Sequence, residues 1–283
     1  MRSHNTAVGN DAGKGITTGV NNTLVGSKAG DALTDADFNV ALGYDTLSTD
    51  TLGSRSTAIG YEALYTQNFT TATQTLNTAV GFQAGTAITT GVQNTLIGSS
   101  AGDAMTDADH NVAVGLNSLG TNVLGSKSTA VGTGALATQN PATAINMYNV
   151  AVGYDAGVSV TTGQSNTLIG SLAGDALTTP ASNTAVGQNA LGADTQGSNT
   201  TAIGAGALQS QNFTTATESY NTAVGTYAGA SVTTGQYNTL IGRASGDAIT
   251  VGNSNTAVGQ NALGADTKGD LNTAIGIGAL QSQ

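Results

Sequence analysis

Short runs of apolar and β-branched residues recur along the chain at a fixed interval, and each run ends in glycine. The string Asn-Thr-Ala-Val-Gly begins at Asn5 and returns with variations to the end of the chain. Successive closing glycines lie 17 residues apart, or 21 residues apart after every fourth unit. These glycines are Gly9, Gly26, Gly43, Gly60, Gly81, Gly98, Gly115, Gly132, Gly153, Gly170, Gly187, Gly204, Gly225, Gly242, Gly259 and Gly276. The fixed period indicates a repeat architecture of sixteen units, nested in a 72-residue super-repeat.

Each unit has the same order of residue types. Position 1 is Asn in thirteen units, position 2 is Thr or Val, position 3 is Ala or Leu, position 4 is Val, Ile or Leu, and position 5 is always Gly. A β-branched run closed by Gly predicts a short strand and a turn. Positions 2 and 4 share one face of such a strand, and position 3 lies on the other. Because Thr and Val exchange at position 2, we expect that position to be packed, and a strand apolar on both faces is typical of a covered parallel sheet.

A single unit cannot fold alone. Ordering each residue costs about 1–2 kcal/mol of backbone entropy, whereas burying one Val or Ile returns only about 1.5–3 kcal/mol. We therefore predict an all-β fold, a parallel β-solenoid of sixteen stacked 17-residue coils, covering residues 5–283 as one repeat domain. Asn residues at one register should form a ladder, and the invariant Gly should supply an unusual backbone angle or a close approach. Residues 1–4 lie outside the repeat, and we interpret them as a candidate cloning remnant.

The composition argues against several classes of partner and of chemistry. The net charge is −10 and the seven basic residues are scattered, which argues against nucleic acid. The absence of Cys excludes disulfides and thiolate metal sites. No run of 18 apolar residues occurs, so we expect no membrane insertion.

Four extra residues follow the fourth unit of each super-repeat, at 67–74, 139–145 and 211–218. Insertions in repeat proteins map to loops on one face, often a binding face. Phe69, Pro141 and Phe213 occupy equivalent places in the three stretches. Two interpretations remain open, since each side chain could pack on its own loop or contact a ligand or receptor. We take the three as candidate surface-contact residues.

Carboxylates gather in one turn of the first two super-repeats. They are Asp31, Asp35, Asp37, Asp103, Asp107 and Asp109. Acidic oxygens clustered in a turn could bind calcium. The later super-repeats keep Asp175 and Asp247 but lose the other two carboxylates, which favours solvated turn residues over a calcium site. We expect no cofactor, with calcium at the six carboxylates as the alternative.

Catalytic signals are weak. The two histidines, His4 and His110, have no repeated partner, and no P-loop, nucleophile elbow or zinc spacing is present. A polysaccharide-degrading β-helix would need paired carboxylates, and the two glutamates, Glu62 and Glu218, lie far apart in the array. We therefore predict that the chain is not an enzyme.

The Asn-Thr-Ala-Val-Gly and Asn-Thr-Leu-Ile-Gly motifs resemble the head repeats of trimeric autotransporter adhesins. The longer string Asn183-Thr-Ala-Val-Gly-Gln-Asn-Ala-Leu191 is similar to repeats of bacteriophage tail-fibre-like proteins. The resemblance covers residues 5–283, although the coils here are longer than adhesin-head coils. It implies a left-handed β-roll assembled as a homotrimer, an extracellular or virion-surface location, and no catalytic residues.

Two functions follow from these observations. The first is a structural fibre or adhesin segment that spaces or presents a host- or surface-binding tip, with a cell-surface glycan or protein receptor as candidate partner. The second is an ice- or surface-binding solenoid that uses Thr arrays, because Thr doublets recur at Thr17-Thr18, Thr89-Thr90, Thr161-Thr162 and Thr233-Thr234. The doublets occur only once in four coils, which is sparse for a continuous lattice. Since the chain begins and ends in phase with its repeat, we expect it to be a fragment of a longer fibre or a shaft whose ends are covered by neighbours.

Overall fold

The computed structural model describes residues 4–282, which divide into two compact units, Met1–Asn146 and Met147–Gln283. Each unit is built from coils of about 17 residues that contribute one short parallel strand apiece. Residues 4–282 contain no helix. The predicted all-β parallel β-solenoid of about sixteen coils is confirmed. Residues 1–3 of the non-repeat start, and Gln283, lie outside the described residues, and His4 belongs to no strand.

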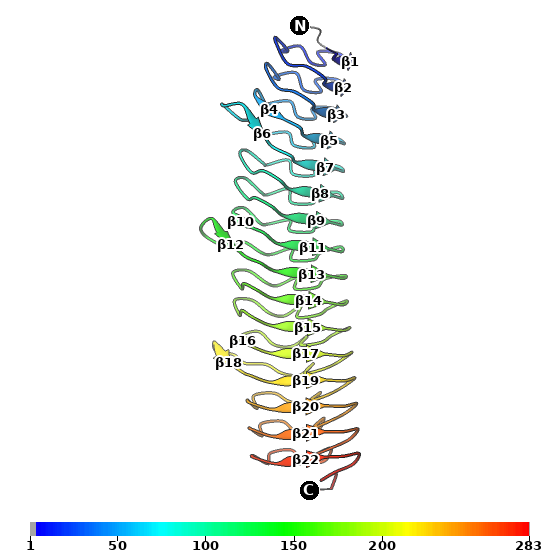
Figure 1. The fold of residues 1–283 in the computed structure, drawn as a ribbon, viewed down its shortest axis with the longest axis vertical. Coiled ribbons are helices and arrows are strands. Elements are labelled where there is room, and N and C mark those ends of the chain that lie inside the picture. The colour runs from blue at the N-terminus through cyan, green and yellow to red at the C-terminus, as the bar shows by residue number, and fades with distance from the viewer. Residues whose placement is uncertain (1–3, 283) are drawn as a thin grey trace. The chain divides into compact units, whose positions relative to one another are not determined.

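In the first unit the strands of the main sheet follow one another in chain order (Figure 1). They are β1 (Thr6–Val8), β2 (Thr23–Val25), β3 (Val40–Leu42), β5 (Thr57–Ile59), β7 (Thr78–Val80), β8 (Thr95–Ile97), β9 (Val112–Val114) and β11 (Thr129–Val131). Each strand pairs with the same positions of the next, as Ala7 does with Leu24. Two short strand pairs lie apart from the main sheet: β4 (Gly53–Ser54) with β6 (Thr73–Gln74), and β10 (Gly125–Ser126) with β12 (Ile145–Asn146).

The second unit repeats this arrangement. Its main sheet contains β13 (Val150–Val152), β14 (Thr167–Ile169), β15 (Thr184–Val186), β17 (Thr201–Ile203), β19 (Thr222–Val224), β20 (Thr239–Ile241), β21 (Thr256–Val258) and β22 (Thr273–Ile275). A short pair, β16 (Gly197–Ser198) with β18 (Thr217–Glu218), lies apart from it. The predicted short strands are three residues long in the main sheet. Turns and bends make up most of each coil.

The interior of the stack is filled by residues at positions 3 and 9 of neighbouring coils. Position 3 is fully buried, as at Leu24 and Ala58. A Cβ on Gly13, at position 9, would lie 2.7 Å from Cδ1 of Leu24. In the third and fourth coils of each super-repeat, where position 3 is Ala, position 9 is a Leu, such as the buried Leu47 and Leu64. Gly13 and Gly30 thus leave room for the Leu24 side chain that lies between them, as close packing requires.

Positions 2 and 4 point away from this core. Val8 is 59% exposed, Leu42 46% and Ile97 40%, whereas the position-3 residues between them are buried, except in the first strand. The expectation that position 2 is a packed site is wrong for the single chain. The coil covers only the inward face of its strand, so a column of Thr and Val and a column of Val, Ile and Leu line its outer surface.

The Asn ladder is confirmed, and it binds the backbone as well as itself. Asn22 is fully buried, and its Nδ2 donates to the carbonyl of Ala36, 2.8 Å away in the same coil. Its Oδ1 accepts from the backbone N–H of Asn39 at 2.9 Å. The same pattern runs through Asn94 and Asn111. Each Asn therefore satisfies backbone groups that would otherwise be buried without partners.

The closing glycine has both predicted properties. Gly26 adopts φ +134°, a region that L side chains rarely enter. A Cβ at Gly26 would collide with the carbonyl of Gly43 in the next coil. Only glycine allows this combination of backbone angle and close approach.

Candidate ligand grooves beside the insertions

The four-residue insertion leaves the coil on the side away from the main sheet (Figure 1). In the first super-repeat its returning arm forms β6, which pairs with β4 of the preceding coil through Gly53 and Thr73, and through Ser54 and Gln74. The arms at β10–β12 and β16–β18 pair in the same way. The insertion is thus a two-stranded extension of the coil wall.

A buried carboxylate anchors the base of the insertion. Asp50 is fully buried and accepts hydrogen bonds from the N–H groups of Gly53 (3.0 Å) and Phe69 (3.2 Å), and from Nε2 of Gln67 (2.6 Å). Burial raises the pKa of Asp50, although these hydrogen bonds act in the opposite direction. Desolvation disfavours the charged form of a carboxyl group. The Asp50 network therefore fixes where the insertion starts.

The second unit contains the same anchor. Asp194 is fully buried and accepts from the N–H groups of Gly197 (3.0 Å) and Phe213 (3.2 Å), and from Nε2 of Gln211 (2.6 Å). Burial raises its pKa as well. Asn122 takes the equivalent place in the second super-repeat, where its Oδ1 accepts from the N–H of Gly125. An acceptor at this position is therefore common to all three insertions.

The three candidate surface-contact residues are buried. Phe69 is 7% exposed and Phe213 is 5% exposed, and Pro141 is also buried. Each aromatic ring packs at the base of its own insertion, which is the first of the two interpretations offered for these positions. Contact with a partner through these insertions stays a prediction, and it would have to use neighbouring exposed residues such as Thr70 and Thr71.

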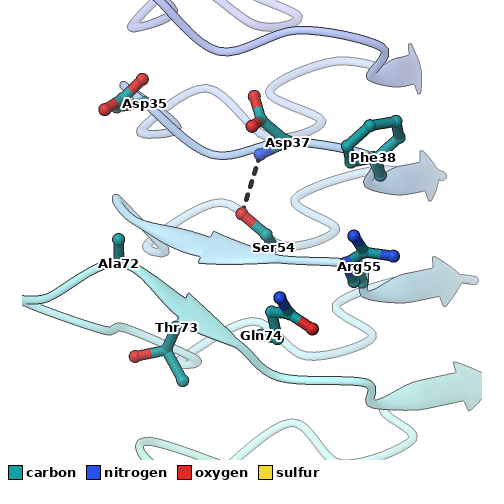
Figure 2. Close-up of a pocket in the computed structure, with 8 residues that line it drawn as sticks. All are labelled: Asp35, Asp37, Phe38, Ser54, Arg55, Ala72, Thr73 and Gln74. Carbon is teal, nitrogen blue, oxygen red and sulfur yellow. Dashed lines mark hydrogen bonds between the residues drawn. The ribbon is translucent and has the colours of Figure 1, made fainter.

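An open groove of about 280 Å³ lies where the first insertion meets the two preceding coils. Figure 2 shows Asp37, Phe38, Ser54, Arg55 and Gln74 along it. The N–H of Asp37 donates to Oγ of Ser54 at 2.9 Å. The Arg55 guanidinium lies 5.2 Å from the centre of the Phe38 ring, in cation–π geometry. The groove thus combines one aromatic ring with donors and acceptors from three chain segments.

A second groove, of about 530 Å³, lies at the equivalent place in the second unit. Ser198 matches Ser54 in position and role, since its Oγ accepts from the N–H of Ala181 at 3.1 Å. Thr217 likewise matches Thr73, because both hydroxyls donate to the carbonyl two residues earlier. The remaining lining differs: this groove has no aromatic ring and no basic side chain, and Asn199 and Glu218 supply its polar groups.

The acidic turn residues are used within the fold. Oδ1 of Asp35 accepts from the hydroxyl of Thr18 at 2.5 Å, and Oδ1 of Asp37 accepts from the N–H of Val20 at 2.7 Å. Asp107 and Asp109 make the equivalent bonds to Thr90 and Val92. In the described chain no three His, Cys, Asp or Glu residues are grouped so that they could hold a metal ion. The geometry therefore offers no calcium site built from the six candidate carboxylates.

Asp31 and Asp103, the first carboxylate of each turn, are half-buried. Desolvation is the largest cause of the raised pKa of both, and a hydrogen bond with Ser100 opposes it at Asp103. At Asp31 the charge of Asp45 adds to the increase, and that of Lys28 opposes it. Oδ1 of Asp31 is buried without a hydrogen-bond partner.

The first Thr of each Thr doublet is used within the fold. The hydroxyl of Thr17 donates to the carbonyl of Thr34, one coil further on, at 3.2 Å. Thr89, Thr161 and Thr233 make the same bond to the next coil. These hydroxyls reinforce coil stacking, whereas the second Thr of each doublet is exposed.

Sequence reasoning missed a stack of aromatic rings on the surface. The ring centres of Tyr44 and Tyr61 lie 5.6 Å apart, and those of Tyr61 and Phe82 lie 5.3 Å apart, with 9° between the planes in both cases. All three are at position 6, just beyond the closing glycine, in consecutive coils. Their identical place in three successive units was the signal that could have revealed the stack.

No protein-family model, curated protein or solved structure matches this chain. Within residues 4–282 there is no helix of the length and apolar character needed to cross a membrane. The similarity to adhesin and tail-fibre repeats therefore rests on the sequence motifs alone.

Proposed function

We propose that the chain is a structural segment of an extracellular or virion-surface fibre or adhesin, assembled as a homotrimer, and that it has no catalytic role. One observation carries this proposal: the outward column at position 4 consists entirely of Val, Ile and Leu and is partly exposed in the single chain. A continuous apolar column on a soluble protein is a contact surface. A second copy carries the same column at the same spacing, so copies can cover one another coil by coil.

The internal construction of the coils supports a mechanical role. Each coil pairs its strand with that of the next, and the Asn ladder and the Thr17-type hydroxyl bonds add further contacts between many of the coils. Stability in such arrays is a sum of repeat and nearest-neighbour terms. A segment of this type can be lengthened by adding further coils of the same kind, and this property suits a spacer.

The proposal can be tested with cysteine labelling, because the chain has no Cys of its own. Ile97→Cys places a thiol on the outward column, and Thr71→Cys places one on the exposed insertion as a matched control. We expect a thiol reagent to modify the Ile97→Cys protein at least about tenfold more slowly, because neighbouring chains cover that column. Equal labelling rates would contradict the trimer.

A second candidate function is favoured by the column at position 2. The hydroxyls of Thr23, Thr57 and Thr95 have no hydrogen-bond partner among the described residues, and thirteen of the sixteen units carry Thr there. Free hydroxyls at regular spacing suit a crystalline surface such as ice. Thermal hysteresis that is lost in a Thr57→Lys, Thr78→Lys protein would support this function, and its absence from the wild-type protein would eliminate it.

A further inference from the structure

We propose that the groove beside the first insertion is a binding site for a neutral saccharide, so that the segment contacts its surroundings along its length as well as at a tip. This inference deepens the adhesin role and rests on it, but the groove does not depend on assembly into a trimer. It does not use Phe69, which lies at the base of the insertion and outside the groove, and it assigns Asp37 to a saccharide and not to calcium.

The groove has hydrogen-bonding capacity that the fold does not use. The amide of Gln74 has no partner among residues 4–282, and no carboxylate of the described chain lies within ion-pair distance of Arg55. Asp37 uses Oδ1 to bind Val20, which leaves Oδ2 available. The hydroxyl of Ser54 accepts from Asp37 and still has a hydrogen to donate. Figure 2 shows these groups from consecutive coils along one side of the wall.

This combination fits hydroxyl groups better than other ligand chemistries. A sugar hydroxyl both donates and accepts, so it can pair with a carboxylate oxygen, an amide and a guanidinium in the same site. The forked side chains of Asp, Gln and Arg can each contact two adjacent hydroxyls. The exposed half of the Phe38 ring adds an apolar face beside them.

The negative charge of the groove and of the chain excludes acidic glycans as ligands. Asp35 and Asp37 outnumber Arg55, and the whole chain carries a net charge of −10, so a sialylated or sulfated glycan would be repelled. The volume of about 280 Å³ lies just under the range of roughly 300–1,000 Å³ typical of small-molecule pockets. We therefore expect the groove to hold one or two sugar residues, with a dissociation constant on the order of 1 mM per groove.

The second groove indicates how specificity would vary along the segment. Ser198 and Thr217 reproduce the framework of Ser54 and Thr73, whereas Asn199 replaces Arg55 and Glu218 replaces Gln74. Glu218 is engaged by the hydroxyl of Tyr220 at 2.6 Å. We therefore expect the two grooves to prefer different saccharides.

The test uses the full chain on a printed array of neutral, sialylated and sulfated glycans, followed by titration of the strongest neutral saccharide. Arg55→Ala and Gln74→Ala remove exposed side chains without touching the core, and Gln93→Ala, at an exposed turn outside the groove, is the matched control. We expect each groove variant to weaken binding at least fivefold, corresponding to the loss of about one hydrogen bond to a charged or polar partner. The control variant should bind as the wild-type protein does.

Three results would overturn the proposal: no array binding above background, binding only to sialylated or sulfated glycans, or equal affinity in the groove variants and the control. None of these results bears on the structural role, which is tested separately by the labelling of Ile97→Cys. If the protein is a trimer that binds no neutral glycan, the proposed fibre role is retained and the proposed saccharide site is rejected.

Discussion

At the scale of single residues, the glycine that closes each strand does two things that no other residue can do together. It adopts a backbone angle open to glycine alone, and it lets the carbonyl of the next coil approach to a distance that excludes a Cβ. The same glycine recurs in every coil. A larger residue at any one of these positions would therefore push two neighbouring coils apart.

Gly26→Ala should therefore destabilise the protein by at least about 3 kcal/mol, from backbone strain together with the collision against Gly43. Gly276→Ala is the control, because Gly276 has φ +124° but no atom closer to its added Cβ than 4.0 Å. We expect the control to lose only the strain component, about 1–3 kcal/mol. Thermal or denaturant unfolding measures both, and equal losses would show that the close approach is unimportant.

The buried Asp50 leads to a prediction about pH. Burial raises its pKa above the ordinary value of 3.8, so the folded protein holds this proton more tightly than the unfolded chain does. The stabilisation from protonation is complete below pH 3.8 and is lost as the pH rises through the raised pKa of the folded state.

Asp50→Asn removes this titration, and Asn122 shows that an amide is accommodated at the equivalent position. The unfolding midpoint of the wild-type protein, relative to that of Asp50→Asn, should rise as the pH falls from neutral toward 3.8. Asp194 titrates in both proteins and cancels in the comparison. A difference that stays flat with pH would contradict the raised pKa.

At the scale of the coil, the Asn ladder supplies buried side-chain hydrogen bonds to the backbone. Asn94 is fully buried, donates to the carbonyl of Ala108 at 2.8 Å and accepts from the N–H of Asn111 at 2.9 Å. Asn94→Ala leaves both backbone groups buried without a partner, which should cost about 2–5 kcal/mol. Gln93→Ala, one residue earlier and exposed, should cost less than about 0.5 kcal/mol. Denaturant unfolding of the two variants checks the contrast, and similar losses would contradict the role of the ladder.

The repeat predicted the element structure well because it reports backbone geometry directly. A period of 17 residues, an Asn at one register and an invariant Gly require stacked coils, and strand, ladder and glycine roles were all confirmed. The sequence predicted less well which face of each strand is buried and which is exposed. Thr and Val have nearly the same shape, so their exchange at position 2 fits a packed interior and a half-exposed sheet face equally.

The candidate grooves were harder to predict, because they combine residues from three consecutive coils that lie well apart in the sequence. Asp37, Arg55 and Gln74 lie 18 and 19 residues apart along the chain, and only the pairing of β4 with β6 brings them onto one wall. The aromatic residues of the insertions were predicted as candidate contacts, yet Phe69 and Phe213 are buried at the base of their insertions. A repeat pattern identifies which positions differ between coils but not which of them face one another.

At the scale of the whole molecule, the account depends on what covers the outward columns. Residues 97 and 114 lie at the same register of the adjacent strands β8 and β9, on the outer face. Charges placed there would meet the same charges on neighbouring copies. In the single chain they would remain in water and leave the core intact, so the protein should fold but fail to assemble.

The most direct measurement is therefore the mass in solution, by light scattering, of the wild-type protein and of the Ile97→Lys, Val114→Lys double variant, with circular dichroism as the check on folding. We expect the mass of three chains for the wild-type protein and of one chain for the variant, both with β-rich spectra. A wild-type protein that is β-rich and has the mass of one chain would contradict the fibre account, and would leave the free Thr column at position 2 as the functional surface.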